Sequence, residues 1–225
     1  MKSRIAALIV GLPERGARVT EALASVQAQT RPVDDTLIGL DPRHYGEAGN
    51  MNRLIEATDC DWIAFCHDDD VWHHDHIEFA EPYTYGDYDV IVSDFVSVGR
   101  PQNTFEPYHD DWDDLKYTNW FPPSVVIARK EVFGQWIEGR TPTQDPWFDK
   151  KDLPRLHSNN PWIDWANWRR LLHEGARFVR TRKRTVDYRF LGDNGSWTAE
   201  QAAAAMAKNV LKDPLASMRA AVLDF

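Results

Sequence analysis

The chain has 225 residues, 43% of them hydrophobic, which is enough to bury a sizeable core near the upper end of single-domain length. Its formal net charge of -9 argues against a protein that grips nucleic acid, because phosphate binding draws on clustered Lys and Arg. No apolar stretch approaches the roughly 20 residues that cross a bilayer, and no charged-then-apolar leader is recognised. We therefore expect a soluble, cytoplasmic protein without a transmembrane segment.

Both cysteines fit a reducing compartment. Cys60 and Cys66 flank one predicted strand. At about 3.3 Å per residue they stand roughly 20 Å apart, too far for a disulfide between them. No Cys-x-x-Cys pair is present, so a structural zinc site is not expected either.

The first part of the chain alternates predicted strands with predicted helices. The continuous apolar run 5–10 is typical of a strand buried on both faces, and 18–29 has the apolar spacing of an amphipathic helix. A strand over 36–40, a helix over about 50–57 and a strand over 62–66 follow. This order predicts an α/β fold with a mostly parallel sheet, in which ligands bind at the carboxyl ends of the strands.

Acidic residues follow two of these strands. Asp41 comes directly after the second strand, and Asp68-Asp69-Asp70 follows the third. Three successive carboxylates repel one another, so a cation is expected to compensate them. Mg²⁺ and Mn²⁺ take oxygen ligands and bridge to substrate phosphates. The cluster thus predicts a metal site for a phosphate-bearing substrate, and a solvated turn before the next helix is the alternative.

The rest of the chain is less regular. Strands are expected over 89–93 and 124–128, and helices over about 163–174 and 199–211. A basic run over 177–184 reads as a solvated strand or loop, with phosphate binding as the less favoured interpretation. Most of the ten tryptophans follow residue 110; flat apolar faces suit sugar rings, although packing is the expected role of the majority.

Taken in order, these features resemble glycosyltransferase family 2 over about residues 5–196. The pieces that carry the resemblance are Pro13-Glu14-Arg15 after the first strand, the segment 24–30, Asp41, Asn52 and the segment 65–70. The resemblance implies the A-type glycosyltransferase fold, with a Rossmann-like central sheet flanked by helices. It also implies one domain over 1–225, in which about 1–98 bind a UDP- or GDP-sugar donor and about 99–225 bind the acceptor.

The resemblance assigns roles to individual residues near the predicted donor site. Nucleotide contacts are expected at the residues that follow the first two strands and precede the acid cluster: Pro13, Glu14, Arg15, Asp41, Asn52 and Asp68. An ordinary Asp-Pro turn is the alternative at Asp41. The family's Asp-x-Asp-Asp motif aligns with residues 67–70, so His67 replaces its first carboxylate. Asp69 matches the main metal-binding acid, and Asp70 and His67 complete the expected ligands of Mn²⁺ or Mg²⁺.

Two later segments continue the resemblance. Asp164 opens a predicted helix where the family has its catalytic base, which would take the proton of the acceptor hydroxyl and give inversion at the anomeric carbon. An acid at a helix start also interacts favourably with the helix dipole, and both roles are compatible. Tyr188-Arg189-Phe190-Leu191 resembles the closing Tyr-Arg-x-His segment, with Leu191 where many members have histidine.

Two other classes of function stay open on the sequence. A metal-dependent phosphohydrolase could use the His67–Asp70 cluster together with His73, His74, Asp75 and His76. The departures at His67 and Leu191 are compatible with a non-catalytic carbohydrate-binding protein. For the favoured glycosyltransferase, the acceptor is a glycan, a lipid-linked molecule or a protein, and the sequence does not choose among them.

Overall fold

In the computed structural model the chain divides into two compact units, Met1–Phe190 and Leu191–Phe225. The structure describes residues 2–40, 47–99, 111–116, 120–134 and 163–190, all within the first unit. The helix expected over 199–211 lies outside these ranges. No helix in the described ranges is long and apolar enough to cross a membrane.

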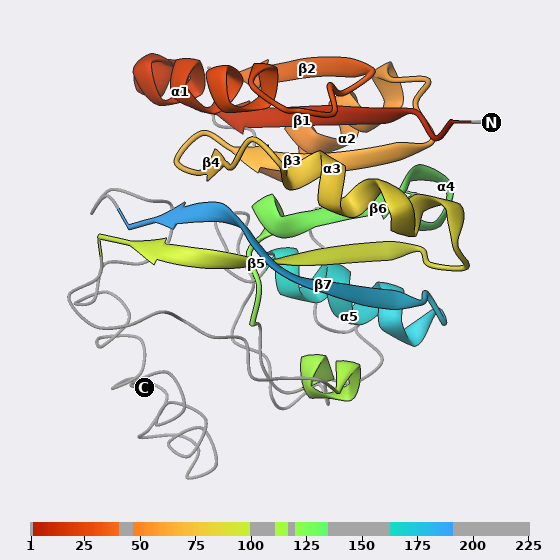
Figure 1. Cartoon of the computed structure of the whole chain (residues 1–225). Helices are drawn as coiled ribbons and strands as arrows, with labels where there is room; N and C mark the ends of the chain where they lie inside the picture. The colour runs from red at the N-terminus through yellow and green to blue at the C-terminus, as the bar shows by residue number, and fades with distance from the viewer. Residues whose placement is uncertain (1, 41–46, 100–110, 117–119, 135–162, 191–225) are drawn as a thin grey trace, which may run out of the picture. The chain divides into compact units, whose positions relative to one another are not determined.

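Strands and helices alternate through the first half of the first unit (Figure 1). The elements are β1 (Ile5–Gly11), the 3-10 turn η1 (Pro13–Arg15), α1 (Gly16–Gln27), β2 (Asp35–Leu40), α2 (Glu47–Ala57), β3 (Trp62–His67), β4 (Val71–Trp72), α3 (His76–Ala80) and the 3-10 turn η2 (Glu81–Tyr85). The predicted strands and helices of this half are confirmed to within a few residues. β1 is buried along its whole length, as its apolar run predicts.

In the second half, short elements separate two long strands. They are β5 (Val90–Val98), η3 (Trp112–Lys116), η4 (Pro123–Val125), β6 (Val126–Arg129), α4 (Lys130–Phe133), α5 (Ile163–His173) and β7 (Phe178–Arg189). The helix expected over 163–174 is therefore confirmed as α5. The strand expected over 124–128 begins two residues later, because Ser124 belongs to the 3-10 turn that precedes β6.

The seven strands of the described ranges form one mixed sheet with the order β2-β1-β3-β6-β5-β7-β4. The pairs β1/β2, β1/β3 and β5/β7 are parallel. β6 is antiparallel to both of its neighbours, and β4 is antiparallel to β7. The parallel half matches the expectation from the alternating pattern. Because β6 is antiparallel to both β3 and β5, these two strands run in the same direction. The carboxyl ends of β1, β3, β5 and β7 therefore lie on the same side of the sheet.

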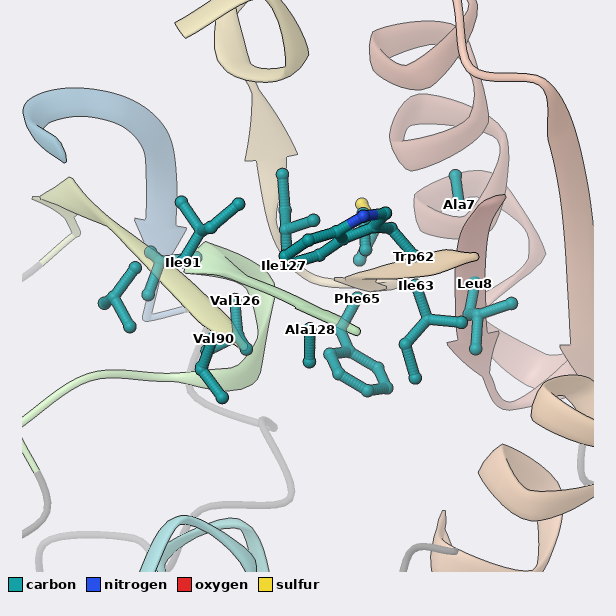
Figure 2. Packing of buried hydrophobic residues seen from close by; sticks show 14 of the residues in the cluster. Ala7, Leu8, Trp62, Ile63, Phe65, Val90, Ile91, Val126, Ile127 and Ala128 are labelled. Carbon is teal, nitrogen blue, oxygen red and sulfur yellow. The ribbon is translucent and has the colours of Figure 1, made fainter. Parts of the chain in front are cut away.

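The core is built on both faces of this sheet, with β3 at its centre. Figure 2 shows apolar side chains of β1, β3, β5 and β6 packed together, among them Leu8, Ile63 and Phe65. The Phe65 ring lies 5.3 Å from Phe133 and 6.3 Å from Trp168, between ring centroids. Trp168 is fully buried, and its contact with Phe65 packs α5 against β3. Cys60 and Cys66 are both buried and free, as predicted.

Except for Arg177, which directly precedes the strand, the basic run over 177–184 lies within β7, and two of its arginines form ion pairs with acids. Arg180 makes two hydrogen bonds to Asp94, at 2.5 and 2.9 Å, and Arg177 binds Asp89. The register between β5 and β7 shifts twice near Asp94, and Arg182 has a φ of 55°. These irregularities accommodate extra residues in β7. Alternation of apolar and polar residues does not reveal a strand whose charged side chains are paired with acids on another strand.

A buried histidine joins α3 to β7. His76 is 1% exposed, its Nδ1 lies 2.7 Å from Thr185 Oγ1, and its ring packs 4.5 Å from Trp72. Burial, with a smaller contribution from the nearby charge of His73, lowers the pKa of His76 to about 3. His73 itself bonds to Asp187 at 2.8 Å. His76 therefore serves the fold as a neutral side chain.

We expect His76 to make the protein less stable in mild acid. The unfolded chain binds this proton below about pH 6.5, whereas the folded chain binds it only near pH 3, so the free energy of unfolding falls as pH drops between those values. At pH 5 the loss is about 2 kcal/mol. Urea unfolding of wild type and His76→Phe at pH 7.5 and pH 5 gives the difference in the free energy of unfolding between the two proteins at each pH. The contributions of other titrating groups cancel in this difference. An unchanged difference at the two pH values would contradict the assignment.

Candidate active site

The three carboxylates occupy the turn between β3 and β4, at the edge where β1, β3 and β7 end. β1 pairs with β3 so that Val10 lies opposite His67, and the backbone N–H of Asp68 donates to Val10 O at 3.0 Å. The N–H of Asp70 closes the turn on His67 O at 3.1 Å. The acid cluster therefore lies at the carboxyl end of a central strand, where the sequence analysis expects a ligand site.

Asp68 faces the loop that follows β1. Its Oδ2 accepts a hydrogen bond from the N–H of Leu12 at 3.3 Å, and its Oδ1 lies 3.4 Å from Arg15 Nη1. The Asp68 side chain is 5% exposed and the Arg15 side chain 16%. Two residues predicted to serve the nucleotide, 53 positions apart in sequence, are thus in contact. Pro13 and Glu14, on the same 3-10 turn as Arg15, are exposed.

Gly11 allows Asp68 to take this position. A Cβ at Gly11 would lie 2.7 Å from Asp68 Cβ, 2.8 Å from Asp68 Oδ2 and 2.8 Å from Val19 Cγ2. All three distances are shorter than real Cβ contacts, and two of the atoms belong to the acid itself. The side chain of Asp68 therefore lies directly over the end of β1.

Asp69 is a buried acid beside another acid. The residue is 9% exposed, and burial raises the pKa of its carboxyl group, an effect that Asp68 increases and His67 opposes. A carboxylate in such a place is stabilised when a cation approaches. Asp69 is therefore a carboxylate that could hold a cation brought in by a phosphate-bearing ligand.

Asp70 is fully buried and is held from two sides. Ser124 Oγ donates to its Oδ2 at 2.6 Å, and the backbone N–H of Arg189 donates to its Oδ1 at 3.1 Å. Burial and the charge of Asp69 raise the pKa of Asp70 to about 7. Both carboxyl oxygens of Asp70 thus accept hydrogen bonds from the protein, which fix the position of this acid at the end of the turn.

A metal ion at this cluster would have to be shared with a substrate. Within the described residues, no group of three or more His, Cys, Asp or Glu side chains is placed to hold a metal ion. Mg²⁺ bound to substrate phosphates needs only one or two protein carboxylates, and buried Asp69 meets that need. The neighbouring histidines serve other contacts, because His73 bonds Asp187 and His76 bonds Thr185. A many-ligand site of the phosphohydrolase kind finds no support in the described geometry.

Asp164 lies at the start of α5, as predicted. Its Oδ1 accepts the N–H of Trp165 at 2.8 Å, and the side chain is half-buried. One turn further along, Trp168 ties α5 to Phe65 on β3. The acid is therefore carried by a helix that is packed against the strand leading to the acid cluster.

The other sequence-predicted residues divide into two groups. Asn52 is half-buried on α2, a helix that also places Asn50 Nδ2 2.8 Å from Gly39 O on β2. Asp41 and Leu191 lie outside the described residues. Sequence reasoning missed Ser124, which no local pattern distinguishes from an ordinary residue before a strand.

Comparison with known proteins finds one matching family model and a set of similar folds. Residues 40–133 match the model of the family described as Glycosyl transferase family 2. The fold resembles that of TarS from S. aureus: the structure of TarS 1-349 in complex with UDP aligns with a TM-score of 0.56 at 12% identity, over 83% of this chain and 60% of that one. TarS 1-349 in complex with UDP-GlcNAc aligns with a TM-score of 0.56 at 13% identity, over 91% of this chain and 65% of that one. No curated protein matches the sequence.

The fold is thus the A-type glycosyltransferase fold. The match to the family 2 model covers less than half of the chain. The chain spans less than two thirds of the length of these TarS chains.

We expect Gly11→Ala to disturb the donor side of the site. The new methyl group would push against Asp68, which would lose its contacts with Leu12 and Arg15 or strain the end of β1. Overpacking of this kind costs about 1–3 kcal/mol. Thermal denaturation and calorimetric titration of UDP with Mn²⁺ should both show a loss. Gly16→Ala is the matched control, because a Cβ there meets nothing within 4 Å; equal behaviour of the two variants would contradict the crowding at Gly11.

Proposed function

We propose that this chain is a metal-dependent glycosyltransferase that moves a sugar from a nucleotide-diphosphate-sugar donor to an acceptor hydroxyl. The observation that carries the proposal is the buried turn 68–70 at the carboxyl end of β3, in contact with Arg15 of the loop after β1. In a family 2 fold this edge of the sheet is where a ligand is expected. The family match and the fold support the same activity.

On this proposal the donor nucleotide lies against the first half of the chain. Its contacts come from the loop after β1 with Pro13, Glu14 and Arg15, from Asp41 and Asn52, and from Asp68. TarS was solved with UDP and with UDP-GlcNAc, which favours a UDP-sugar as the first donor to test, and a GDP-sugar is the second. The acceptor is a glycan, a lipid-linked molecule or a protein, bound by the half after about residue 99.

Asp69 is proposed to hold the metal ion, with Asp70 and His67 on the same turn as the further ligands. A bound Mn²⁺ or Mg²⁺ would offset the negative charge that builds on the departing nucleoside diphosphate. The protein's own part is to present buried carboxylates at a fixed place. Arg15 adds positive charge on the nucleotide side of the turn and is itself oriented by Asp68.

Asp164 is proposed as the general base. The acceptor oxygen forms a bond to the anomeric carbon while the bond from that carbon to the phosphate oxygen breaks. The proton of the acceptor hydroxyl passes to the Asp164 carboxylate, and the nucleoside diphosphate leaves with the bonding electron pair. A single displacement of this kind inverts the configuration at the anomeric carbon.

Asp69→Asn should nearly abolish turnover, by at least about 10²-fold, because the amide removes the charge that binds the metal. Release of UDP from UDP-GlcNAc in the presence of Mn²⁺ measures the loss, and excess EDTA should reproduce it in the wild type. Asp59→Asn, an exposed acid on the loop before β3, is the control and should leave the rate unchanged. Full wild-type activity in EDTA would show that the reaction needs no metal ion.

Asp164→Asn should separate chemistry from binding. The variant keeps the shape of the side chain and removes its basicity, so transfer should fall by about 10²- to 10⁴-fold under single-turnover conditions. Affinity for UDP with Mn²⁺, measured by calorimetry, should stay within about three-fold of wild type because the metal serves only the leaving group. Transfer at the wild-type rate would assign the base to a different acid.

A further inference from the structure

Arg189, at the end of β7, makes three hydrogen bonds that bring distant parts of the chain to the acid turn. Its backbone N–H donates to Asp70 Oδ1, as described above. Its side-chain Nε donates to the backbone carbonyl of Asp69 at 2.5 Å. Its Nη1 donates to Glu21 Oε2 on α1 at 2.7 Å. Arg189 thus contacts the side chain of Asp70, the backbone of Asp69, and Glu21 on helix α1.

Ser124 holds the same turn from the opposite direction. Its Oγ accepts the N–H of His67 at 3.0 Å and donates to Asp70 Oδ2 at 2.6 Å. The hydroxyl is fully buried and uses both its donor and its acceptor capacity within one strand end. The turn is therefore fixed at its first residue and at its last by Ser124, and at its last two residues by Arg189.

This arrangement matters because the turn has to keep carboxylates close together. Repulsion between adjacent buried charges favours any movement that separates them, and the low polarity of the surroundings strengthens it. A guanidinium donating to the carbonyl of Asp69 stabilises the backbone of that residue while its carboxylate is left to other contacts. Glu21 orients the guanidinium, since an ion pair at 2.7 Å restricts where its other nitrogens can lie.

We propose that Arg189, oriented by Glu21, is a positioning residue that sets the direction of the Asp69 carboxylate for the metal ion. The proposal rests on the glycosyltransferase function proposed above. Residues behind a metal ligand commonly change metal affinity by about 10- to 100-fold when they are replaced. Because the Glu21 side chain is 58% exposed, a substitution there removes the ion pair with Arg189 without disturbing the core. We call this ion pair the clamp.

The experiment measures Mn²⁺ affinity in the presence of saturating UDP, by titration followed with electron paramagnetic resonance. Arg189→Gln should weaken Mn²⁺ binding by about 10- to 100-fold, and Glu21→Gln by a smaller factor of about 3 to 10. The spectrum of the bound ion should also change in both variants, because the ligand carboxylate is no longer held in one direction. Arg189→Lys keeps the positive charge but loses the planar set of guanidinium N–H donors. Its Mn²⁺ affinity should therefore lie between those of Arg189→Gln and wild type.

Arg177→Gln is the matched control. Arg177 directly precedes β7, at the opposite end of the strand from Arg189, and its guanidinium binds Asp89. This variant should lose some stability in urea and keep the wild-type Mn²⁺ affinity and spectrum. If Glu21→Gln and Arg189→Gln lower only the stability, as Arg177→Gln does, the positioning role is overturned. If the combined variant loses the sum of the two single effects, Glu21 does not act through Arg189 and the proposed clamp is overturned as well.

The same measurements distinguish failure of the positioning role from failure of the proposed metal-dependent glycosyltransferase function. Wild-type protein that binds UDP and Mn²⁺ together, with variants that bind equally well, contradicts the positioning role alone. Wild-type protein that binds no Mn²⁺ in the presence of UDP contradicts the metal-dependent mechanism, and the positioning role falls with it.

Discussion

The local structure of this site follows from the burial of three adjacent carboxylates at the end of β3. Like charges this close resist folding unless each is given a partner or a proton, and the chain provides a different solution for each acid. Asp68 pairs with Arg15 and the backbone of Leu12, and Asp70 is bonded by Ser124 and Arg189. Asp69 lies between them, and burial raises the pKa of its carboxyl group.

The strand that carries this turn is also the one on which the core is centred. β3 pairs with β1 on one side and β6 on the other, and Phe65 packs against Phe133 and Trp168 from α4 and α5. The helix that begins with Asp164 is therefore anchored to the same strand as the acid turn. The proposed base and the proposed metal ligand would both benefit from this shared support, because catalysis is sensitive to small displacements of the reacting groups.

Charged and titratable residues outside the turn serve mainly to join distant segments. His76 is kept neutral by burial and connects α3 to β7 through Thr185, and Arg180 connects β7 to β5 through Asp94. These contacts explain why a histidine-rich stretch and a basic run, which suggest metal or phosphate binding when read along the chain, are accounted for by the fold. A side chain that already has a buried partner is costly to redirect toward a ligand.

The sequence by itself determined the elements whose evidence is local. The apolar run of β1, the helical spacing of α1 and the position of the acid cluster after β3 were all readable, because periodicity and strand ends are properties of neighbouring residues. The resemblance to family 2 added the fold class, which the family match and the TarS structures support. The individual roles of the site residues, Asp69 and Asp164 foremost, stay predictions.

Only the tertiary structure decided which residues surround the acids. Ser124 is 54 positions from Asp70, Arg189 is 119 positions from it, and Glu21 is 168 positions from Arg189. No local pattern encodes contacts over such separations, and the reversal of β6 that makes the sheet mixed is equally invisible along the chain. The charges of β7 were readable along the chain, but their partners on and next to β5 were not. Strand direction and charge pairing follow from where the whole chain can bury its apolar faces, which is a property of the complete fold.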